Sequence, residues 1–409
     1  MKKVLMAATA IATAGAIWGT AGDAKAQTNW TLSLGGFYNG LVIVRDQDNE
    51  EYTVPQPKTG GGTNSKTDIR NYDFNQRGRY RFEARNKLDN GITFGFQNQY
   101  EMTQNMNTNR SFIFVSGGFG RVNFGDMYSA SYLTHVSAPS AGWVLDDTGH
   151  SQAYYSTVGN PNPYGGRASP ATPTYMSNRF MKVTYLSPRF GGLQVGASFT
   201  PDTSNSNAGP GANNRFITDE NTIDNSASLY AFKNVVSLGA NYSNTFGDFG
   251  LDASLGWETA EVTDGFKNTV PNADSRNNHY SAGLNLSFGG LTAGAAYGLK
   301  EVNRGSDLLV SELVLGLTYS TGQWVFGPNF SWAEGYGGDR NGGGQRIFLF
   351  EFGARYKLVP GVDLVASIEH GEFDKASSGA VYACQSGGAV CNQKDGSGTA
   401  GLFGVQLNF

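Results

Sequence analysis

The chain has 409 residues, of which only 16% are charged, whereas ordinary soluble domains carry about 25%. Glycine (56 residues) and neutral polar side chains take the place of charges, alongside 20 Tyr and 26 Phe, and hydrophobic residues reach 39%. The formal net charge of −4 excludes the strongly basic balance of nucleic-acid-binding proteins, so no nucleic-acid partner is expected. The mixture suits strands that are apolar on one face and neutral-polar on the other.

The N-terminal segment has the layout of a secretory signal peptide. Lys2 and Lys3 precede an apolar stretch over 4–17, and small residues flank Lys25 at a cleavage site. We predict a signal peptide at 1–26 and one domain at 27–409, whose 27 basic and 33 acidic side chains give a net charge of about −6. Beyond residue 26 no apolar run reaches about 18 residues, so helical membrane spans are not expected.

Alternation of apolar with small or polar residues recurs from residue 76 to the C-terminus. Such a period of two predicts strands with one apolar face. The clearest segments are QRGRYRFEARNKL (76–88), FGFQNQYE (94–101), LQVGASF (193–199), VSLGANYS (236–243), FGLDASLGWE (249–258), YSAGLNLSF (280–288), LTAGAAYGL (291–299), ELVLGLTYS (312–320), FLFEFGARYKL (348–358), VDLVASIEH (362–370) and LFGVQLNF (402–409).

Two kinds of connection alternate along the chain. Gly-, Pro-, Asn- and Asp-containing turns that favour hairpins lie at 88–91, 117–120, 187–192, 246–250, 288–290, 320–323 and 358–361. Longer polar segments lie at 46–70, 104–110, 126–178, 200–234, 260–277, 301–308, 334–345 and 373–398. Seven turns and eight loops join sixteen strands, with 226–233 assigned to a loop because the count must be even. The sequence therefore predicts an all-β, antiparallel transmembrane barrel with short periplasmic turns and long external loops.

The arginines of the segment 76–88 decide between this barrel and a soluble β-sandwich. Arg77, Arg79, Arg81 and Arg85 share one strand face, and Tyr80, Phe82 and Ala84 share the other. On a lipid face an arginine near the midplane costs roughly 2–4 kcal/mol, so this set is expected to line a wet lumen. Sandwich strands usually run about 5–6 residues, whereas these run nearer 10, the length needed to cross a membrane.

The chain resembles the general (non-specific) porins of Gram-negative bacteria, of the alphaproteobacterial type. The stretches that carry the resemblance are RFEARNKLDNGITFGFQNQYE, SGGFGRVNFGD, RFMKVTYLSPRFGGLQVGASFTPD and the aromatic terminal strand. They extend over essentially the whole chain after the signal peptide. The resemblance implies an integral outer-membrane channel through which ions and small hydrophilic solutes diffuse passively, without a cofactor.

The resemblance also implies a site and partners. Arg77, Arg79, Arg81 and Arg85 match the basic wall of the pore constriction, and Asp146 and Asp147 match the acidic residues of a third loop folded into the pore. Phe409 matches the C-terminal signal that the barrel-assembly machinery recognises. The implied assembly is a homotrimer in contact with outer-membrane lipid and lipopolysaccharide. By strand parity, further lumen-lining candidates are Glu101, Arg121, Lys182, Asp252 and Glu258.

Other motifs give weaker hypotheses. The stretch GGGTNSKT (60–67) lacks the second glycine of a phosphate-binding loop, and we interpret it as a solvated loop. The stretch DQDNEE (46–51) lacks the turn glycine of a calcium-binding loop. We interpret it as a solvated loop that is able to contact divalent cations or lipopolysaccharide. The histidines have no metal-ligand spacing, and no metal site is predicted. An outer-membrane hydrolase would have His370 as its only nameable candidate residue. A solute-selective channel stays open as an alternative, but the arginine ladder occupies a single strand, which favours a general porin.

Cys384 and Cys391 lie close together in CQSGGAVC, on a chain predicted to be exported, which favours a disulfide. Closing so short a ring stabilises the last external loop by roughly 2–3 kcal/mol on a loop-entropy model. We expect thiol titration of oxidised, denatured protein to find no free thiol, and the same assay after reduction to find both. Two reactive thiols before reduction would contradict the pairing.

Overall fold

The computed structural model describes residues 30–47, 71–102, 108–143, 172–174, 176–177, 179–203, 232–262, 276–303, 307–336, 346–374, 382–383, 390–391 and 396–409. The predicted signal peptide, Cys384, Asp146, Asp147 and the loop motifs at 60–67 and 48–51 lie outside these residues. Predictions that depend on them therefore stay predictions.

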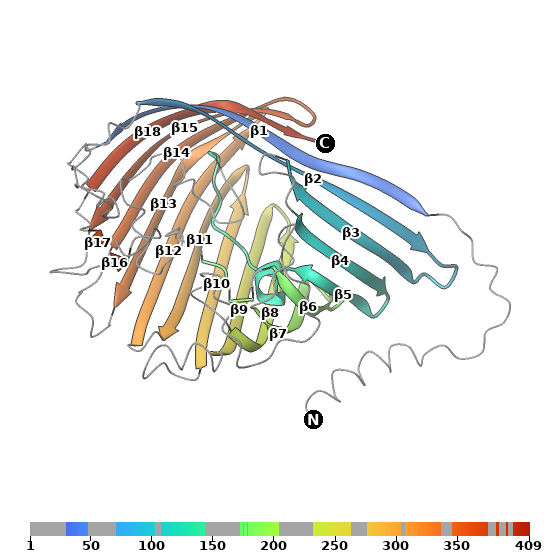
Figure 1. Cartoon of the computed structure of the whole chain (residues 1–409). Helices are drawn as coiled ribbons and strands as arrows, with labels where there is room; N and C mark the ends of the chain where they lie inside the picture. The colour runs from blue at the N-terminus through green and yellow to red at the C-terminus, as the bar shows by residue number, and fades with distance from the viewer. Residues whose placement is uncertain are drawn as a thin grey trace, which may run out of the picture.

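Sixteen antiparallel strands close into one barrel, as the sequence predicts (Figure 1). Each strand pairs with its neighbours along the chain, and β1 closes the ring against β18. The strands are β1 (Thr31–Gln47), β2 (Tyr72–Lys87), β3 (Thr93–Glu101), β4 (Thr108–Gly117), β5 (Gly120–Met127), β6 (Phe180–Leu186), β7 (Leu193–Asp202), β8 (Phe232–Phe246), β9 (Phe249–Val262), β10 (Arg276–Phe288), β11 (Leu291–Asn303), β12 (Asp307–Thr321), β13 (Trp324–Tyr336), β14 (Arg346–Val359), β15 (Val362–Asp374) and β18 (Gly396–Asn408).

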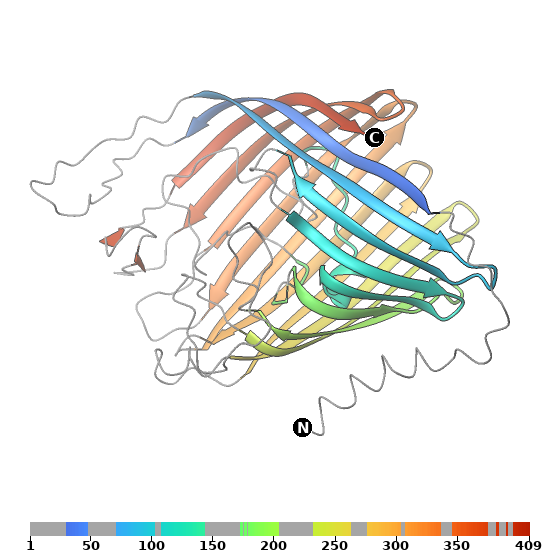
Figure 2. The same cartoon turned by 45° about the vertical axis from the view of Figure 1, so that its right-hand side comes forward.

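All seven predicted turns connect neighbouring strands at one end of the barrel (Figure 2), and the strand ends that the predicted long segments join lie at the other end. In the segment assigned to a loop at 226–233, Phe232 and Lys233 instead begin β8, and 226–231 lie outside the described residues. Two features were not predicted: a one-turn helix, α2 (Ala130–Leu133), and a small ladder of β16 (Tyr382–Ala383) with β17 (Val390–Cys391) in the last long loop.

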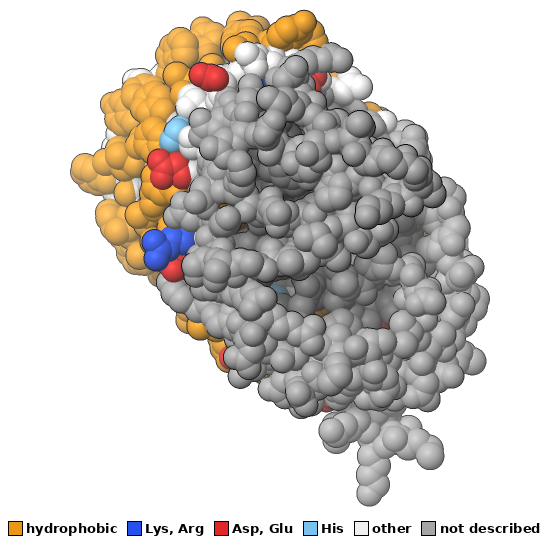
Figure 3. All heavy atoms as spheres, turned by 60° about the vertical axis from the view of Figure 1, so that its left-hand side comes forward, with side chains coloured by type: hydrophobic (Ala, Val, Ile, Leu, Met, Phe, Trp, Pro, Cys, Tyr) orange, Lys and Arg blue, Asp and Glu red, His pale blue; other side chains and the backbone are white. Residues whose placement is uncertain are grey.

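Strand parity separates two surfaces. Glycine, hydroxyl, amide and most charged side chains point inward, while large apolar side chains point outward and stay exposed, as Leu255 does at 68% and Ile368 at 61%. Figure 3 shows apolar side chains over most of the described outer face that is visible in this view. At the end with the short turns the exposed aromatic residues form a belt, comprising Trp30, Phe119, Phe190, Phe246, Phe249, Phe288, Tyr319, Trp324 and Phe409. An apolar band edged by aromatic residues matches the hydrocarbon layer and its interface.

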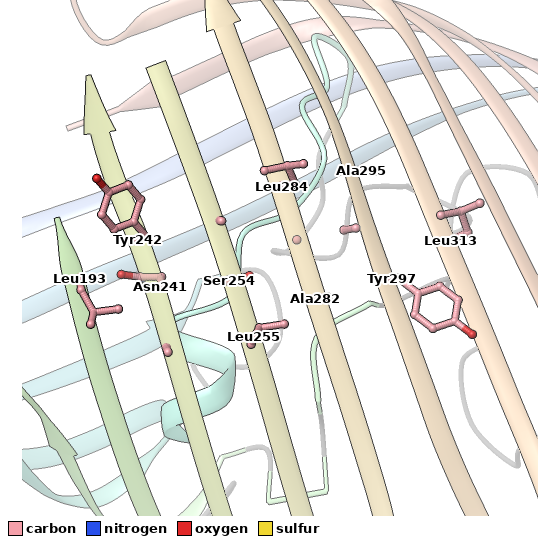
Figure 4. Close-up of a pocket in the computed structure, with 14 residues that line it drawn as sticks. Leu193, Asn241, Tyr242, Ser254, Leu255, Ala282, Leu284, Ala295, Tyr297 and Leu313 are labelled. Atoms are coloured by element: carbon pink, nitrogen blue, oxygen red, sulfur yellow. The ribbon is translucent and has the colours of Figure 1, made fainter. Parts of the chain in front are cut away.

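A shallow hollow interrupts the outer face across β7 to β12 (Figure 4). Ala240, Ala253, Ala282 and Ala295 form its floor because they leave space between longer neighbours. Its rim includes Leu193, Tyr242, Leu255, Leu284, Tyr297 and Leu313. The hollow has a volume of about 530 Å³ and lies on the apolar side of the wall.

Among the described residues, no helix has the length and apolar character needed to cross a membrane.

The barrel closes at the C-terminus. Residues Phe37 to Gln47 of β1 pair with Gly398 to Asn408 of β18, and the last residue extends this ladder. The Gly36 amide donates to the Phe409 carbonyl at 2.8 Å, and the Phe409 amide donates to the Gly36 carbonyl at 3.1 Å. The Phe409 ring is exposed on the outer side of this seam.

We expect deletion of Phe409 to reduce outer-membrane assembly more than it reduces expression. Deletion removes both hydrogen bonds to Gly36, worth about 1 kcal/mol each, together with the ring that the family resemblance implies is recognised during assembly. Phe409→Ala separates the two effects because it keeps the backbone bonds. Heat-modifiability gels of membrane fractions measure assembly. If Phe409→Ala assembles as well as the unmodified chain, the ring is not a signal.

Candidate functional site

The four arginines predicted for the pore wall lie on the inner face of β2. In the β1–β2 pairing, Arg77, Arg79, Arg81 and Arg85 lie opposite inward residues of β1. On the other side of β2, Arg79 lies opposite Glu101 of β3. The four arginines are called the basic face below. Glu83 lies on the same face, between Arg81 and Arg85.

Glu101 divides the basic face into two halves. Its carboxylate forms an ion pair with Arg79, lies 3.4 Å from the Arg77 guanidinium, and accepts a 2.9 Å hydrogen bond from the Asn109 amide. Arg79 is buried in this contact, at 5% exposure. Arg81 and Arg85 are exposed, and neither has an ion-pair partner among the residues that the structure describes. The charge accessible to the lumen is therefore concentrated toward the end of β2 nearer the short turns.

Two more arginines extend this wall and lie over aromatic rings. The Arg121 guanidinium on β5 lies 3.9 Å from the ring centre of Phe114, and Arg110 on β4 lies 3.9 Å from that of Tyr128. Arg121 also donates to Asn123 at 2.8 Å. Cation–π contacts hold guanidinium planes flat against rings, which fixes these charges close to the wall.

The third loop, residues 128–179, connects β5 to β6, and its described first part, 128–143, runs inside the barrel along the inner wall. Ser129 caps α2, and the loop backbone then donates to hydroxyls of successive strands. The Ala130 amide donates to Ser198 on β7 and the Ser131 amide to Ser237 on β8, each at 3.1 Å. Farther along, the Val136 amide donates to Ser254 on β9 at 2.8 Å.

Inward glycines let the loop backbone lie directly against the strands. They form a track across the wall at Gly196, Gly239, Gly256, Gly283, Gly294, Gly316 and Gly353. A Cβ at Gly283 would overlap the Val136 carbonyl, and one at Gly316 would overlap the Pro139 carbonyl. The amides of Asn285 and Asn329, beside the track, donate to the Ser137 and Pro139 carbonyls at 3.0 Å. A larger side chain at Gly239, Gly283, Gly316 or Gly353 would meet loop backbone at under 3 Å and would push the loop into the lumen.

Two buried charges hold the base of the third loop. Glu258 on β9 is fully buried and accepts hydrogen bonds from the Met176 amide at 2.8 Å and from the Ser177 amide and hydroxyl. The Lys182 ammonium on β6 donates to the carbonyls of Met127, Ser177 and Phe180. Lys182 and Glu258, which parity places toward the lumen, are thus covered by the loop.

A histidine also joins the two described limbs of the loop. His135 Nε2 lies 2.9 Å from the Thr172 hydroxyl. Burial, and secondarily the charge of Lys300, lower the pKa of His135 to about 4, so its ring is neutral at physiological pH. In the described parts of the chain, no group of three or more His, Cys, Asp or Glu side chains is arranged to hold a metal ion.

The basic face lies opposite the loop. Following the strand order, β10 is half-way round the ring from β2, and β10 carries Gly283, where Val136 crosses the track. The open lumen thus lies between exposed arginines on one wall and the loop on the other. Sequence reasoning found the arginines but missed the track, although glycines at inward parity on seven strands were a readable signal.

The chain matches the family model described as Gram-negative porin over residues 7–376, about nine tenths of its length. The chain belongs to the Gram-negative porins. It is accordingly an integral outer-membrane barrel that forms a channel for passive diffusion.

The chain is also similar in sequence to two uncharacterised proteins of Rickettsia. One from Rickettsia conorii is 22% identical, with 74% of this chain and 76% of that protein covered; one from Rickettsia bellii is 21% identical, with 79% and 81% covered. Among solved structures, the anion-selective porin from Comamonas acidovorans has a TM-score of 0.56 at 16% identity, with 93% of this chain and 100% of that chain covered. OmpT of Vibrio cholerae has a TM-score of 0.56 at 12% identity, with 95% and 100% covered. These structural likenesses support the fold.

We expect Glu258→Ala to loosen the base of the third loop. The change leaves the Met176 and Ser177 amides without their buried acceptor and should lower the free energy of unfolding by about 1–3 kcal/mol for each amide left unpaired. Denaturant unfolding in detergent, followed by tryptophan fluorescence, measures the loss. The matched control is Glu261→Ala on the same strand, whose pairing with Arg276 is solvent-exposed and worth about 0–1 kcal/mol. Equal losses in both variants would contradict the assigned role.

Proposed function

We propose that the chain works as a trimeric general porin whose constriction lies between the basic face of β2 and the third loop. The observation that carries the proposal is the docking of the loop on the inner wall opposite β2. A loop held there narrows the lumen without closing it, so solutes pass between a polar strap and a cationic wall. Barrels of sixteen strands leave an aqueous channel of this kind.

The division of the basic face suggests which residues set ion preference. Arg77, Arg79 and Glu101 sum to one positive charge and are largely enclosed, whereas Arg81 and Arg85 are exposed beside a single Glu83. In a confined pore such fixed charges bias ion flux. We propose Arg81 and Arg85 as the main source of anion attraction. The solved porin from Comamonas acidovorans is described as anion-selective, and the same preference is proposed here.

The acidic side of the constriction is proposed from the family resemblance. Asp146 and Asp147 follow the described part of the loop by a few residues, and neutralising both should shift selectivity toward anions. Cations on one wall and carboxylates opposite would orient dipolar solutes as they pass.

A channel is proposed in preference to a hydrolase. His370, the candidate for enzymatic chemistry, contacts the Thr399 hydroxyl at 2.9 Å and the Glu372 carboxylate at 3.5 Å. Strand parity turns these side chains away from the lumen, because the neighbouring Glu369 points inward. Hydrolysis of a lipid or phospholipid by purified protein, lost in His370→Ala, would revive the enzyme hypothesis.

The trimer, the lipopolysaccharide contact and recognition of Phe409 by the assembly machinery are proposed from the family. One structural neighbour, OmpT of Vibrio cholerae, was solved in a form described as a trimer, which supports the first of these. Current steps in threes and a heat-dissociable trimer in detergent gels are the expected observations. Saturable, solute-blocked current would instead indicate a solute-selective channel.

We expect Arg81→Gln/Arg85→Gln to lower the anion-to-cation permeability ratio by at least about twofold, because it removes both exposed charges of the basic face. Reversal potentials of reconstituted channels in a salt gradient measure the ratio. The matched control is Arg79→Gln/Glu101→Gln, which removes one enclosed charge of each sign and should leave the ratio nearly unchanged. An unmoved reversal potential in the first variant would exclude Arg81 and Arg85 from the narrow part of the pore.

A further inference from the structure

The inner wall carries an apolar patch where a water-filled lumen predicts polar side chains. It is formed by inward residues of five neighbouring strands, namely Leu41 and Ile43 of β1, Ala333 of β13, Ile347 and Leu349 of β14, Val365 of β15, and Ala400 and Leu402 of β18. All of them are buried, at 1–5% exposure. Leaving such a patch against pore water would cost hydrophobic free energy, so it requires a cover.

Trp143 of the third loop lies in this patch. Its side chain is 1% exposed and packs in one apolar cluster with residues of the patch, among them Leu349, Val365 and Leu402. A buried tryptophan removes more apolar surface from water than any other side chain. Trp143, the last residue of the described stretch 128–143, therefore anchors the loop on the inner wall.

Polar contacts fix the backbone next to Trp143. The Glu351 carboxylate on β14 accepts from the Trp143 amide at 3.0 Å and from the Ser140 hydroxyl at 2.9 Å. The Arg355 guanidinium donates to the Gly142 carbonyl at 3.2 Å. A Cβ on Gly353 would overlap the backbone of Gly142, and a Cβ on Gly142 would overlap the Glu351 carboxylate.

We propose that residues 140–143 form a latch that sets the width of the pore. Trp143 is the positioning residue of this latch, acting through the loop. The apolar cluster supplies the holding energy, and Glu351, Arg355 and Gly353 set the register. While the latch is closed, the third loop lies flat on the wall from β7 to β14. When it opens, residues 140–143 leave the wall while the loop keeps the contacts of its base, the hydroxyl contacts up to Val136 and the asparagine contacts of Ser137 and Pro139, and the boundary of the lumen moves near β14.

Single-channel recording tests the latch, and the inference rests on the chain forming a channel. We expect Trp143→Ala to change the mean conductance by at least about 1.5-fold and to increase open-channel current noise, since pore width sets conductance. Trp143→Phe, which refills most of the pocket, should restore both. If the unmodified chain shows no conductance, the channel function itself is wrong. If the unmodified chain conducts and Trp143→Ala has the same conductance and noise, only the latch is wrong.

A backbone variant covers the case in which Trp143→Ala does not assemble. Gly353→Ala should reproduce the change in conductance and noise, because the added Cβ displaces Gly142. The control is Gly401→Ala, a strand glycine whose added Cβ would meet its nearest atom at 3.9 Å. If Gly353→Ala and Gly401→Ala both conduct as the unmodified chain does, the proposed register at the latch is wrong.

Thiol labelling reports on the latch independently of conductance. In a background with both native cysteines replaced by serine, Leu349→Cys lies in the apolar cluster with Trp143 and should react slowly with a charged, membrane-impermeant methanethiosulfonate. Adding Trp143→Ala should raise the labelling rate by at least about tenfold, because local opening limits access to buried groups. An equal rate in both backgrounds would show that Trp143 does not cover the patch.

Discussion

The need to pair every backbone amide and carbonyl inside hydrocarbon underlies this structure. A closed ring of strands meets that need without a free edge, and closure then fixes the parity of each side chain. Once Phe37 to Gln47 of β1 pair with β18, every residue of the wall faces either lipid or lumen. The aromatic belt, the alanine hollow and the basic face all follow from that single division.

The inner wall is itself divided into regions of different chemistry. On β2 to β5, Arg77 and Arg79 are paired with Glu101, Arg110 and Arg121 lie over aromatic rings, and Arg81 and Arg85 are exposed to the lumen. From β7 to β14, glycines and short hydroxyl side chains accept the loop backbone, and the neighbouring patch on β13, β14, β15, β18 and β1 is apolar. The loop thus lies first on glycines and hydroxyls of β7 to β9, then on glycines and asparagine amides of β10 to β13, and last on the apolar patch. Loop amides donate to the hydroxyls, and the Trp143 side chain packs on the apolar patch.

The sequence was enough to predict the number of strands, the positions of the turns and the inward direction of the arginines from Arg77 to Arg85. Strands are recognised by alternation with a period of two, and turns by their Gly, Pro, Asn and Asp residues. The pairing of Arg79 with Glu101 could not be predicted, since it depends on the stagger between β2 and β3. The sequence also did not predict that the third loop covers Lys182 and Glu258, because strand parity alone places both side chains in an open lumen. Trp143 was missed because nothing near it in the sequence alternates; its partners come from strands up to 259 residues away.

The glycine track restricts where this pore can diversify. A substitution at Gly239, Gly283, Gly316 or Gly353 displaces the loop backbone, so these four lumen positions on the β7 to β14 wall cannot acquire side chains that contact a passing solute. Variation that alters solute preference without remodelling the loop is left to the opposite wall, at positions such as Arg81, Arg85, Gln97 and Gln99, and to the free edge of the loop. Among porins that share this track, differences in what they transport should therefore appear as sequence variability on one side of the barrel and constancy on the other.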